Sequence, residues 1–195
     1  MDTVGFDEAE AWSRARAGDS ASFAALFDQH RDRVFGQALR LLRAPHDAED
    51  VTAMVFLEAW RRRESVRVVD GSIVAWLLVT TNNVVRNDSR STRRYRIALA
   101  KLSHPGPQPD HGPDVDDIMD NSERTRVVRE AFATLSAHDQ DVITLCLIEE
   151  LPLAQAAAAL DVPVGTVKSR LSRAKRRLGE ITLAGLEPVL EGGAE

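Results

Sequence analysis

A proline-rich interruption divides this 195-residue chain and limits what it can fold into. Pro105, Pro107, Pro109 and Pro113 lie within the stretch 103–113. Proline removes a backbone donor and disfavours helical geometry in the residue before it, so no helix can cross this stretch. Several aspartates between positions 110 and 120 make the same region acidic. We therefore expect a flexible linker over 100–121 between a unit at 1–99 and a unit at 122–180, and a mostly frayed tail over 181–195.

Both units show the three- and four-residue spacing of apolar side chains that is typical of helices. In the first unit this spacing covers 22–42, 47–63 and 73–90, and in the second it covers 123–135, 139–149, 153–160 and 164–178. Asp47 and Ser72 are expected N-caps, and Ser136 with Asp139 resembles a capping box. Richness in Ala and Arg favours helix over sheet. The expected fold is all-α: two small helical domains joined by a flexible acidic Pro-rich linker, the second containing a helix-turn-helix.

The stretch from Leu151 to Leu178 supplies the helix-turn-helix pattern. A short Ala-rich helix is interrupted at Asp161-Val162-Pro163, and a second helix follows with an apolar back. Its other face is basic, and no acid occurs between positions 164 and 178. A solvated helix face normally mixes both signs of charge, so this face favours binding to DNA. A purely structural helical hairpin is the alternative.

The helix expected over 73–90 changes character along its length. Its first half is apolar, whereas its second half is rich in Asn and Arg. Asparagine side chains can bond adenine, and arginine can bond guanine or phosphate. This change indicates a helix that leaves the core and contacts nucleic acid. The alternative is a solvated helix end with capping asparagines.

Composition and missing motifs exclude several classes of protein. Hydrophobic residues make up 44% and charged residues 28% of the chain, which is ordinary for a globular protein, and the net charge of −5 argues against a general polyanion binder. No apolar run is long enough to span a bilayer, and the acidic N-terminus lacks a signal-peptide core, so we expect a cytoplasmic protein.

Cys146 is the single cysteine, which excludes an internal disulfide, and His104 and His111 lack neighbours for a metal site. No catalytic or phosphate-binding motif is present, so neither an enzyme nor a cofactor is expected.

Three segments, taken in order, resemble a bacterial RNA polymerase sigma factor of the extracytoplasmic-function group of the sigma-70 family. The segment from Asp47 to Trp60 looks like the helix that docks on the polymerase clamp. The segment from Trp76 to Asn87 looks like the one that melts and recognises the minus-ten promoter element. The string from Val162 to Ala174 looks like the recognition helix for the minus-thirty-five element and is highly specific for the second domain of this family.

The resemblance implies roles for individual residues. The minus-ten contacts would be Asn83, Arg86, Asn87 and Arg90. The minus-thirty-five contacts would be Thr166, Lys168, Ser169, Arg170, Ser172, Arg173 and Arg176, with Thr166 and Arg170 on the DNA backbone. The polymerase contacts would be Asp47, Asp50, Phe56 and Trp60. The implied partners are core RNA polymerase, promoter DNA and an anti-sigma factor.

Two features leave alternatives open. The family often has a Gln and an acid where this chain has Ala53 and Met54, so the detail of polymerase docking is undecided. The acidic linker either threads the RNA exit path of the polymerase or is a solvated spacer. Two other classes of protein also compete with a sigma factor: a stand-alone helix-turn-helix regulator with an N-terminal dimerisation or sensing module, and a helical interaction protein that binds no DNA.

Overall fold

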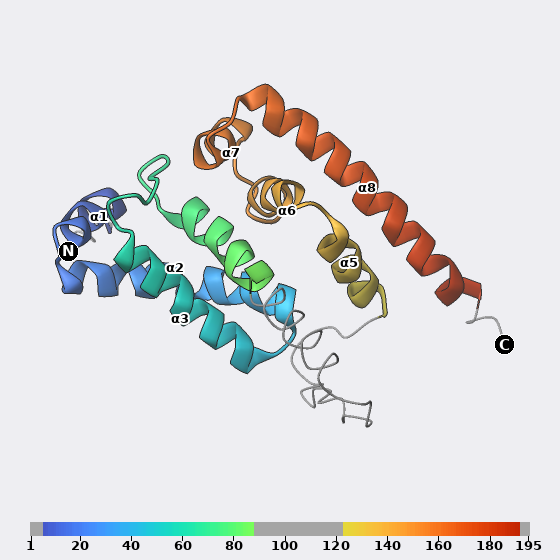
Figure 1. Cartoon of the computed structure of the whole chain (residues 1–195), viewed down its shortest axis with the longest axis horizontal. Coiled ribbons are helices and arrows are strands. Elements are labelled where there is room, and N and C mark those ends of the chain that lie inside the picture. The colour runs from blue at the N-terminus through green and yellow to red at the C-terminus, as the bar shows by residue number, and fades with distance from the viewer. Residues whose placement is uncertain (1–5, 88–122, 192–195) are drawn as a thin grey trace, which may run out of the picture.

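The computed structural model describes residues 6–87 and 123–191, and the regular structure in these ranges is helical (Figure 1). The N-terminal unit contains α1 (Glu8–Arg16), α2 (Ser20–Leu42), α3 (Pro45–Arg61) and a helix over 74–87. The C-terminal unit contains α5 (Glu123–Thr134), α6 (Ala137–Ile143), the π-helical turn η1 (Thr144–Ile148), α7 (Leu153–Leu160) and α8 (Val164–Glu191). The predicted linker lies outside the described residues.

Side-chain caps fix the starts of several helices. The Asp19 carboxylate accepts a hydrogen bond from the Ala21 N–H at 3.0 Å and begins α2. The Ser136 hydroxyl accepts from the Asp139 N–H at 3.2 Å, which confirms the predicted cap of α6. Each cap satisfies a backbone donor that has no partner within its helix.

Two details of the helical pattern were predicted wrongly, and one helix was missed. Asp47 is not an N-cap, because α3 begins at Pro45, whose missing N–H costs nothing in the first turn, and Asp47 lies inside that turn. The short helix α1 was not predicted at all. The interpretation of the residues after Leu178 as a mostly frayed tail is wrong as far as Glu191, because α8 continues without a break over 28 residues.

The core of the N-terminal unit lies where α1, α2, α3 and the helix over 74–87 meet. Leu26, Val55 and Leu77 are fully buried there, and Trp12 is 2% exposed. Truncating a buried leucine of this kind to alanine typically costs about 2–5 kcal/mol. This core fixes the direction of the helix over 74–87, which carries the asparagines singled out in the sequence.

The two units pack against each other through a shared core. Val74 and Leu78 from the helix over 74–87 belong to the same buried cluster as Val142, Leu145 and Val167 from the C-terminal unit. Figure 1 shows α6 and α7 between the N-terminal helices and α8. Asn82, in the polar second half of this helix, is only 1% exposed, so the expected departure of the helix over 73–90 from the core is wrong at that position. Among residues 6–87 and 123–191, the helices lack the combination of length and hydrophobicity that spanning a bilayer requires.

Candidate nucleic-acid interface

The turn between α7 and α8 sets the direction of α8. Asp161 ends α7 in the left-handed region at φ 57°, and the Pro163 carbonyl accepts from the Thr166 N–H at 2.9 Å as α8 begins. Ala156 and Val167 are fully buried between the two helices. The small side chain of Ala156 allows the two helices to pack closely, so one side of α8 is buried against α7 while its opposite side is exposed. The predicted helix-turn-helix is confirmed.

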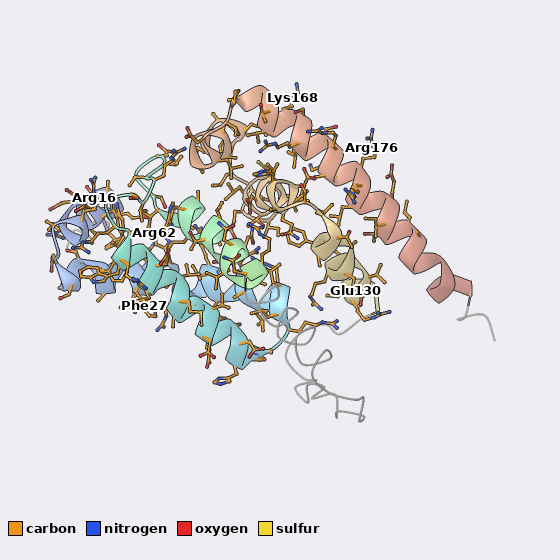
Figure 2. The ribbon with its side chains drawn as sticks, in the orientation of Figure 1. Arg16, Phe27, Arg62, Glu130, Lys168 and Arg176 are labelled. Carbon is orange, nitrogen blue, oxygen red and sulfur yellow. The ribbon has the colours of Figure 1, made fainter. Side chains whose placement is uncertain are left out.

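The outer face of α8 is exposed and basic. Val167 and Ala174 are 0% and 1% exposed, so the residues on the opposite side of the helix face away from the core. Figure 2 shows Lys168 and Arg176 projecting from this helix. The exposed polar residues are Lys168, Ser169, Ser172, Arg173, Lys175, Arg176 and Arg177, and Thr166 and Arg170 are half-buried. All the predicted minus-thirty-five contacts thus lie on one accessible helix.

A cleft of about 540 Å³ lies between the start of α6 and the basic face of α8, and acidic as well as basic residues line it. Its lining includes Arg173 and Arg177 from α8 and Asp139 from α6. Arg176 also pairs with Glu180 one turn further along α8, at 3.7 Å. Exposed pairs of this kind contribute little to stability, so the cations stay available to phosphates.

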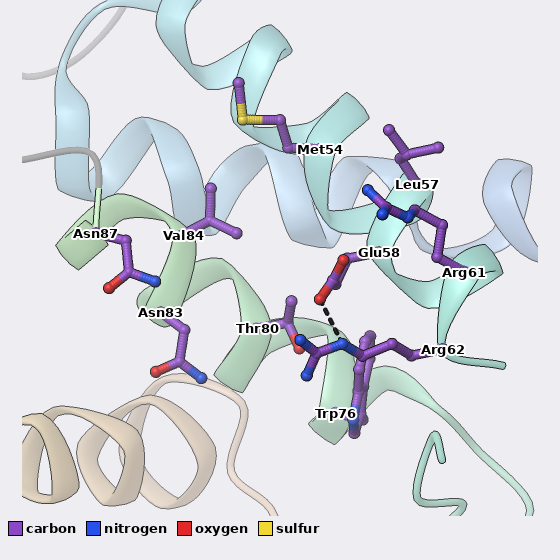
Figure 3. Close-up of a pocket in the computed structure, with 10 residues that line it drawn as sticks. All are labelled: Met54, Leu57, Glu58, Arg61, Arg62, Trp76, Thr80, Asn83, Val84 and Asn87. Carbon is purple, nitrogen blue, oxygen red and sulfur yellow. Dashed lines mark ion pairs between the residues drawn. The ribbon is translucent and has the colours of Figure 1, made fainter. Parts of the chain in front are cut away.

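A second polar surface lies on the helix over 74–87. Asn83 and Asn87 are exposed and line a pocket of about 430 Å³ between this helix and α3 (Figure 3). Arg61 and Arg62 contribute cations to the same pocket, and Arg62 pairs with Glu58. Amide groups suit the edges of unpaired bases and guanidinium groups suit phosphates, so the pocket has the chemistry to hold single-stranded nucleic acid.

Arg86 is not directed outward like its two asparagine neighbours. Its guanidinium bonds the Asp141 carboxylate at 3.2 Å and the Gln140 side chain at 2.9 Å, and it also donates to the Asn83 side chain. Only 16% of the Arg86 side chain is exposed. Arg90, the fourth predicted minus-ten residue, lies outside the described residues.

Comparisons with known proteins decide the family. The family model "Sigma-70 region 2" matches residues 26–95, and "Sigma-70, region 4" matches residues 125–178. The ECF RNA polymerase sigma factor SigK of Mycobacterium sp. (strain KMS) is 34% identical over 158 residues, which cover 78% of this chain and 79% of the relative. SigL of Mycobacterium tuberculosis is 32% identical over 167 residues, which cover 85% of this chain and 92% of the relative.

The chain belongs to the extracytoplasmic-function (ECF) group of sigma-70 factors. The resemblance predicted from the sequence is confirmed. As an ECF sigma factor, the chain directs RNA polymerase to promoters and is not itself an enzyme. The family assignment excludes a stand-alone regulator and a helical interaction protein that binds no DNA.

Solved structures agree with this fold. Sigma factor RpoE of Bartonella quintana, in complex with the anti-sigma factor NepR, matches with a TM-score of 0.51 and 25% identity, covering 82% of this chain and 95% of that one. CnrH, in complex with the cytosolic domain of CnrY, has a TM-score of 0.58 at 22% identity, covering 92% and 99%, and supports the fold alone.

The four residues predicted to dock on polymerase occupy different positions on α3 of the sigma factor. Asp47 and Asp50 are exposed and accessible to a partner. Phe56 is only 3% exposed and packs against Phe27, with ring centroids 4.7 Å apart. Trp60 is half-buried, 5.0 Å from the ring of Phe23. The two aromatic residues therefore hold α3 in place, and a partner cannot reach Phe56 in this arrangement.

Sequence analysis of the sigma factor missed a group of polar residues where its two units meet. Gln37, Asp141 and Thr144 are buried and hydrogen-bonded around Asn82. The available signal was weak: a polar residue on the apolar face of a predicted helix, as at Gln37 between Val34 and Ala38. The spacing of residues along the sequence does not connect these positions, because they are far apart in the chain and meet only where the two units pack together.

Proposed function

We propose that this ECF sigma factor recognises its promoters at two separate places and opens the upstream edge of the transcription bubble. Region 2 would bind the minus-ten element through Asn83, Arg86, Asn87 and Arg90, and region 4 would bind the minus-thirty-five element through α8. The observation that carries this proposal is that each matched sigma-70 region presents an accessible polar surface suited to nucleic acid: the outer face of α8 and the pocket beside Asn83.

The outer face of α8 supports duplex recognition in a major groove. One side of the helix packs against α7. Its exposed side carries lysine and arginine side chains, which are long and positively charged, and serine side chains, which are short and carry hydroxyl groups. Arginine and lysine can contact guanine or phosphate, and serine can contact either base edges or the backbone. Lys168, Ser169, Ser172 and Arg173 would contact base edges and nearby phosphates, with Thr166, Arg170 and Arg176 on the DNA backbone.

The pocket beside Asn83 supports recognition of an unpaired base. Two amides and two guanidinium groups line a space of about 430 Å³, beside the half-buried ring of Trp76. A base taken out of the stack needs polar partners for its edge and cations for the adjoining phosphates. Asn83 would bond the base, and Asn87 would contact the flanking strand.

Docking to core polymerase would use the exposed side of α3. Asp47 and Asp50 lie at the start of that side, and Ala53, Met54 and Leu57 continue it. Met54 is 54% and Leu57 is 56% exposed, so the middle of this surface is apolar. We infer that this sigma factor docks through apolar contacts where the family often uses a Gln and an acid.

An anti-sigma factor is a further proposed partner. The structural neighbour RpoE of Bartonella quintana, at 25% identity, was solved in complex with the anti-sigma factor NepR. We place the sigma factor in the cytoplasm, where the polymerase works. The proposed anti-sigma factor can be tested by co-purification of the sigma factor with the product of a neighbouring reading frame that encodes a membrane span or a zinc-binding motif.

The two-site proposal can be tested by footprinting. The chain is combined with core RNA polymerase, genomic fragments retained by this holoenzyme are isolated, and the bound DNA is probed with hydroxyl radicals. We expect two protected blocks upstream of the start site. Lys168→Ala should weaken only the upstream block, whereas Arg14→Ala, which removes an exposed arginine from α1, should leave both blocks unchanged.

The same footprints contain the outcomes that would contradict the proposal. A single protected block, or equal protection of the upstream block by wild type and Lys168→Ala at limiting protein, would refute the assigned role of α8. Loss of both blocks with Arg14→Ala would show that the effect of removing a cation is not specific to α8.

A further inference from the structure

A cavity of about 330 Å³ that the proposed function does not use lies beside α2, α5 and η1. Its walls are mainly apolar and include Leu41 from α2, Phe132 from α5, Ile143 from α6 and Leu178 from α8. It shares no lining residue with the pocket beside Asn83 or with the exposed basic face of α8. Sites that bind small molecules typically measure about 300–1,000 Å³, so this cavity is large enough for a small ligand.

The cavity extends from the core to the surface. Ile143 is 1% exposed and Phe132 is 8% exposed, and both belong to one buried apolar cluster. Val128 and Leu147 also line the cavity but are 41% and 43% exposed, so a ligand can enter past them from solvent. Walls of this kind favour a hydrocarbon chain, because removing apolar surface from water is favourable.

One guanidinium group makes the cavity suitable for an anion. Arg129 lines it from α5, and its Nε donates to the Arg40 carbonyl at 2.7 Å. The Nη1 atom of Arg129 is buried and has no hydrogen-bond partner within the described residues. Among these residues, no acidic side chain lines the cavity. A buried charged group without a partner is costly, so an anion that bonded Nη1 would be bound favourably.

The other polar side chains of the lining already have partners. Gln37 is fully buried, donates two hydrogen bonds within the core and accepts a third from Arg40 Nε at 3.3 Å. Arg40 also pairs with Glu149 at 3.8 Å, and Thr125 has a partner of its own. The free donor is thus Arg129 Nη1, which suits a head group with one charge and two oxygens. A phosphate would bring further oxygens that apolar walls cannot satisfy.

We propose that this cavity binds an amphipathic carboxylate of the medium-chain fatty acid class. The carboxylate accepts from Arg129 Nη1, and the hydrocarbon chain lies against Leu41, Phe132 and Ile143. The proposal is independent of the proposed promoter contacts, because none of their residues lines the cavity. Both parts of the ligand contribute: the head group supplies the charge that Arg129 lacks, and the chain supplies the apolar burial.

Isothermal titration calorimetry with the full-length chain, without polymerase or DNA, compares three probes. Octanoate has both parts of the proposed ligand, octanol keeps the chain without the charge, and acetate keeps the charge without the chain. We expect octanoate to bind saturably at one site per chain and about tenfold more tightly than octanol, because hydrogen bonds between charged groups are the strong class. Acetate should give no saturable binding.

Arg129→Met should abolish the preference for octanoate over octanol. Methionine keeps much of the length of arginine but carries no charge, so the affinity for octanoate should fall about tenfold. Octanol binding should change less than about twofold, which would show that the cavity persists. Arg126→Met is the matched control on the same helix, because Arg126 pairs with Glu130 at 2.8 Å and does not line the cavity. It should change octanoate binding less than about twofold.

Val128→Trp keeps the test decisive if Arg129→Met does not fold. Val128 is partly exposed where it lines the cavity, so an indole ring there should fill the cavity and abolish octanoate binding without disturbing the buried core. Octanoate binding that persists in Val128→Trp would place the site elsewhere and overturn the proposal.

Three further outcomes would also overturn the proposal. Absence of saturable octanoate binding to the unsubstituted chain would exclude the site. Equal affinities for octanoate and octanol, or equal losses with Arg129→Met and Arg126→Met, would exclude the role of Arg129. A dimer in analytical ultracentrifugation that Val128→Trp dissociates, in a chain that does not bind octanoate, would identify a second copy of the chain as the occupant.

Discussion

Replacing Glu8 tests how α1 positions the helix over 74–87 that carries Asn83. One carboxylate oxygen of Glu8 accepts from His30 Nε2 at 2.8 Å and from the Ile73 N–H at 2.8 Å. Only 17% of the Glu8 side chain and 3% of the His30 side chain are exposed. Glu8 thereby ties α1 to α2 and to the residue that precedes the helix over 74–87.

The expected loss of stability follows from these two hydrogen bonds. Glu8→Ala leaves two sheltered donors without a partner, at about 1–3 kcal/mol each, so the free energy of unfolding should fall by about 3 kcal/mol. Glu8→Gln keeps an acceptor oxygen but loses the charge, and should cost about 1 kcal/mol. Glu10→Gln is the matched control, because Glu10 is on the same helix with 64% of its side chain exposed.

The pH dependence gives a second, independent test of Glu8. Burial opposes ionisation of Glu8, but the hydrogen bonds from His30 and Ile73 outweigh it and hold its pKa below the ordinary value of 4.5. A lowered pKa in the folded state means that the stabilisation is fully present above pH 4.5 and is lost as pH falls through the folded pKa. The difference between wild type and Glu8→Gln should therefore be largest at pH 7 and shrink toward pH 3.

Urea unfolding followed by circular dichroism at several pH values measures both effects. A difference between wild type and Glu8→Gln that stays constant from pH 7 to pH 3, or that grows in acid, would refute the role of the Glu8 charge. Equal losses for Glu8→Gln and Glu10→Gln would show that the hydrogen bonds of Glu8 add nothing beyond a surface charge.

Three further predictions concern the proposed binding surfaces. Arg173→Ala should weaken holoenzyme binding to promoter DNA by about 1–3 kcal/mol, measured by gel shift, and unchanged affinity would exclude a base contact. Asn83→Ala should impair strand opening but spare upstream duplex binding, and permanganate reactivity equal to that of wild type would contradict this. Met54→Glu should alter stability by no more than about 0.5 kcal/mol, because Met54 is 54% exposed, while making polymerase binding more dependent on salt. Identical salt dependence of polymerase binding would refute an apolar docking surface at Met54.

The sequence predicted the features that depend on local periodicity and on short motifs. The apolar spacing of α8, the break at Asp161 and Pro163, and the cap at Ser136 all followed from rules that act over a few residues. The family was predicted from the order of three segments. Phe56 illustrates the limit of that reasoning, because a motif indicates that a residue matters without distinguishing a contact from a core position.

Long-range pairing could not be predicted from one sequence. Asn82 and Asp141 are 59 positions apart, and each had a local explanation as a polar residue on a helix. Nothing in the chain indicates that they meet until the apolar surfaces around Leu78 and Leu145 are known to share a core. The packing of the two units against each other was not predicted for the same reason, because the sequence of a linker does not show whether the units that it joins are in contact.

The most direct test of promoter-directed function is transcription by the reconstituted holoenzyme. Core RNA polymerase is supplied with this sigma factor and with fragmented genomic DNA of the source organism, and the 5′ ends of the transcripts are sequenced. We predict defined start sites that share one sequence block near position minus ten and another near minus thirty-five, with no such transcripts from core polymerase alone. Start sites that share neither block, or the same transcripts with and without the sigma factor, would contradict the account.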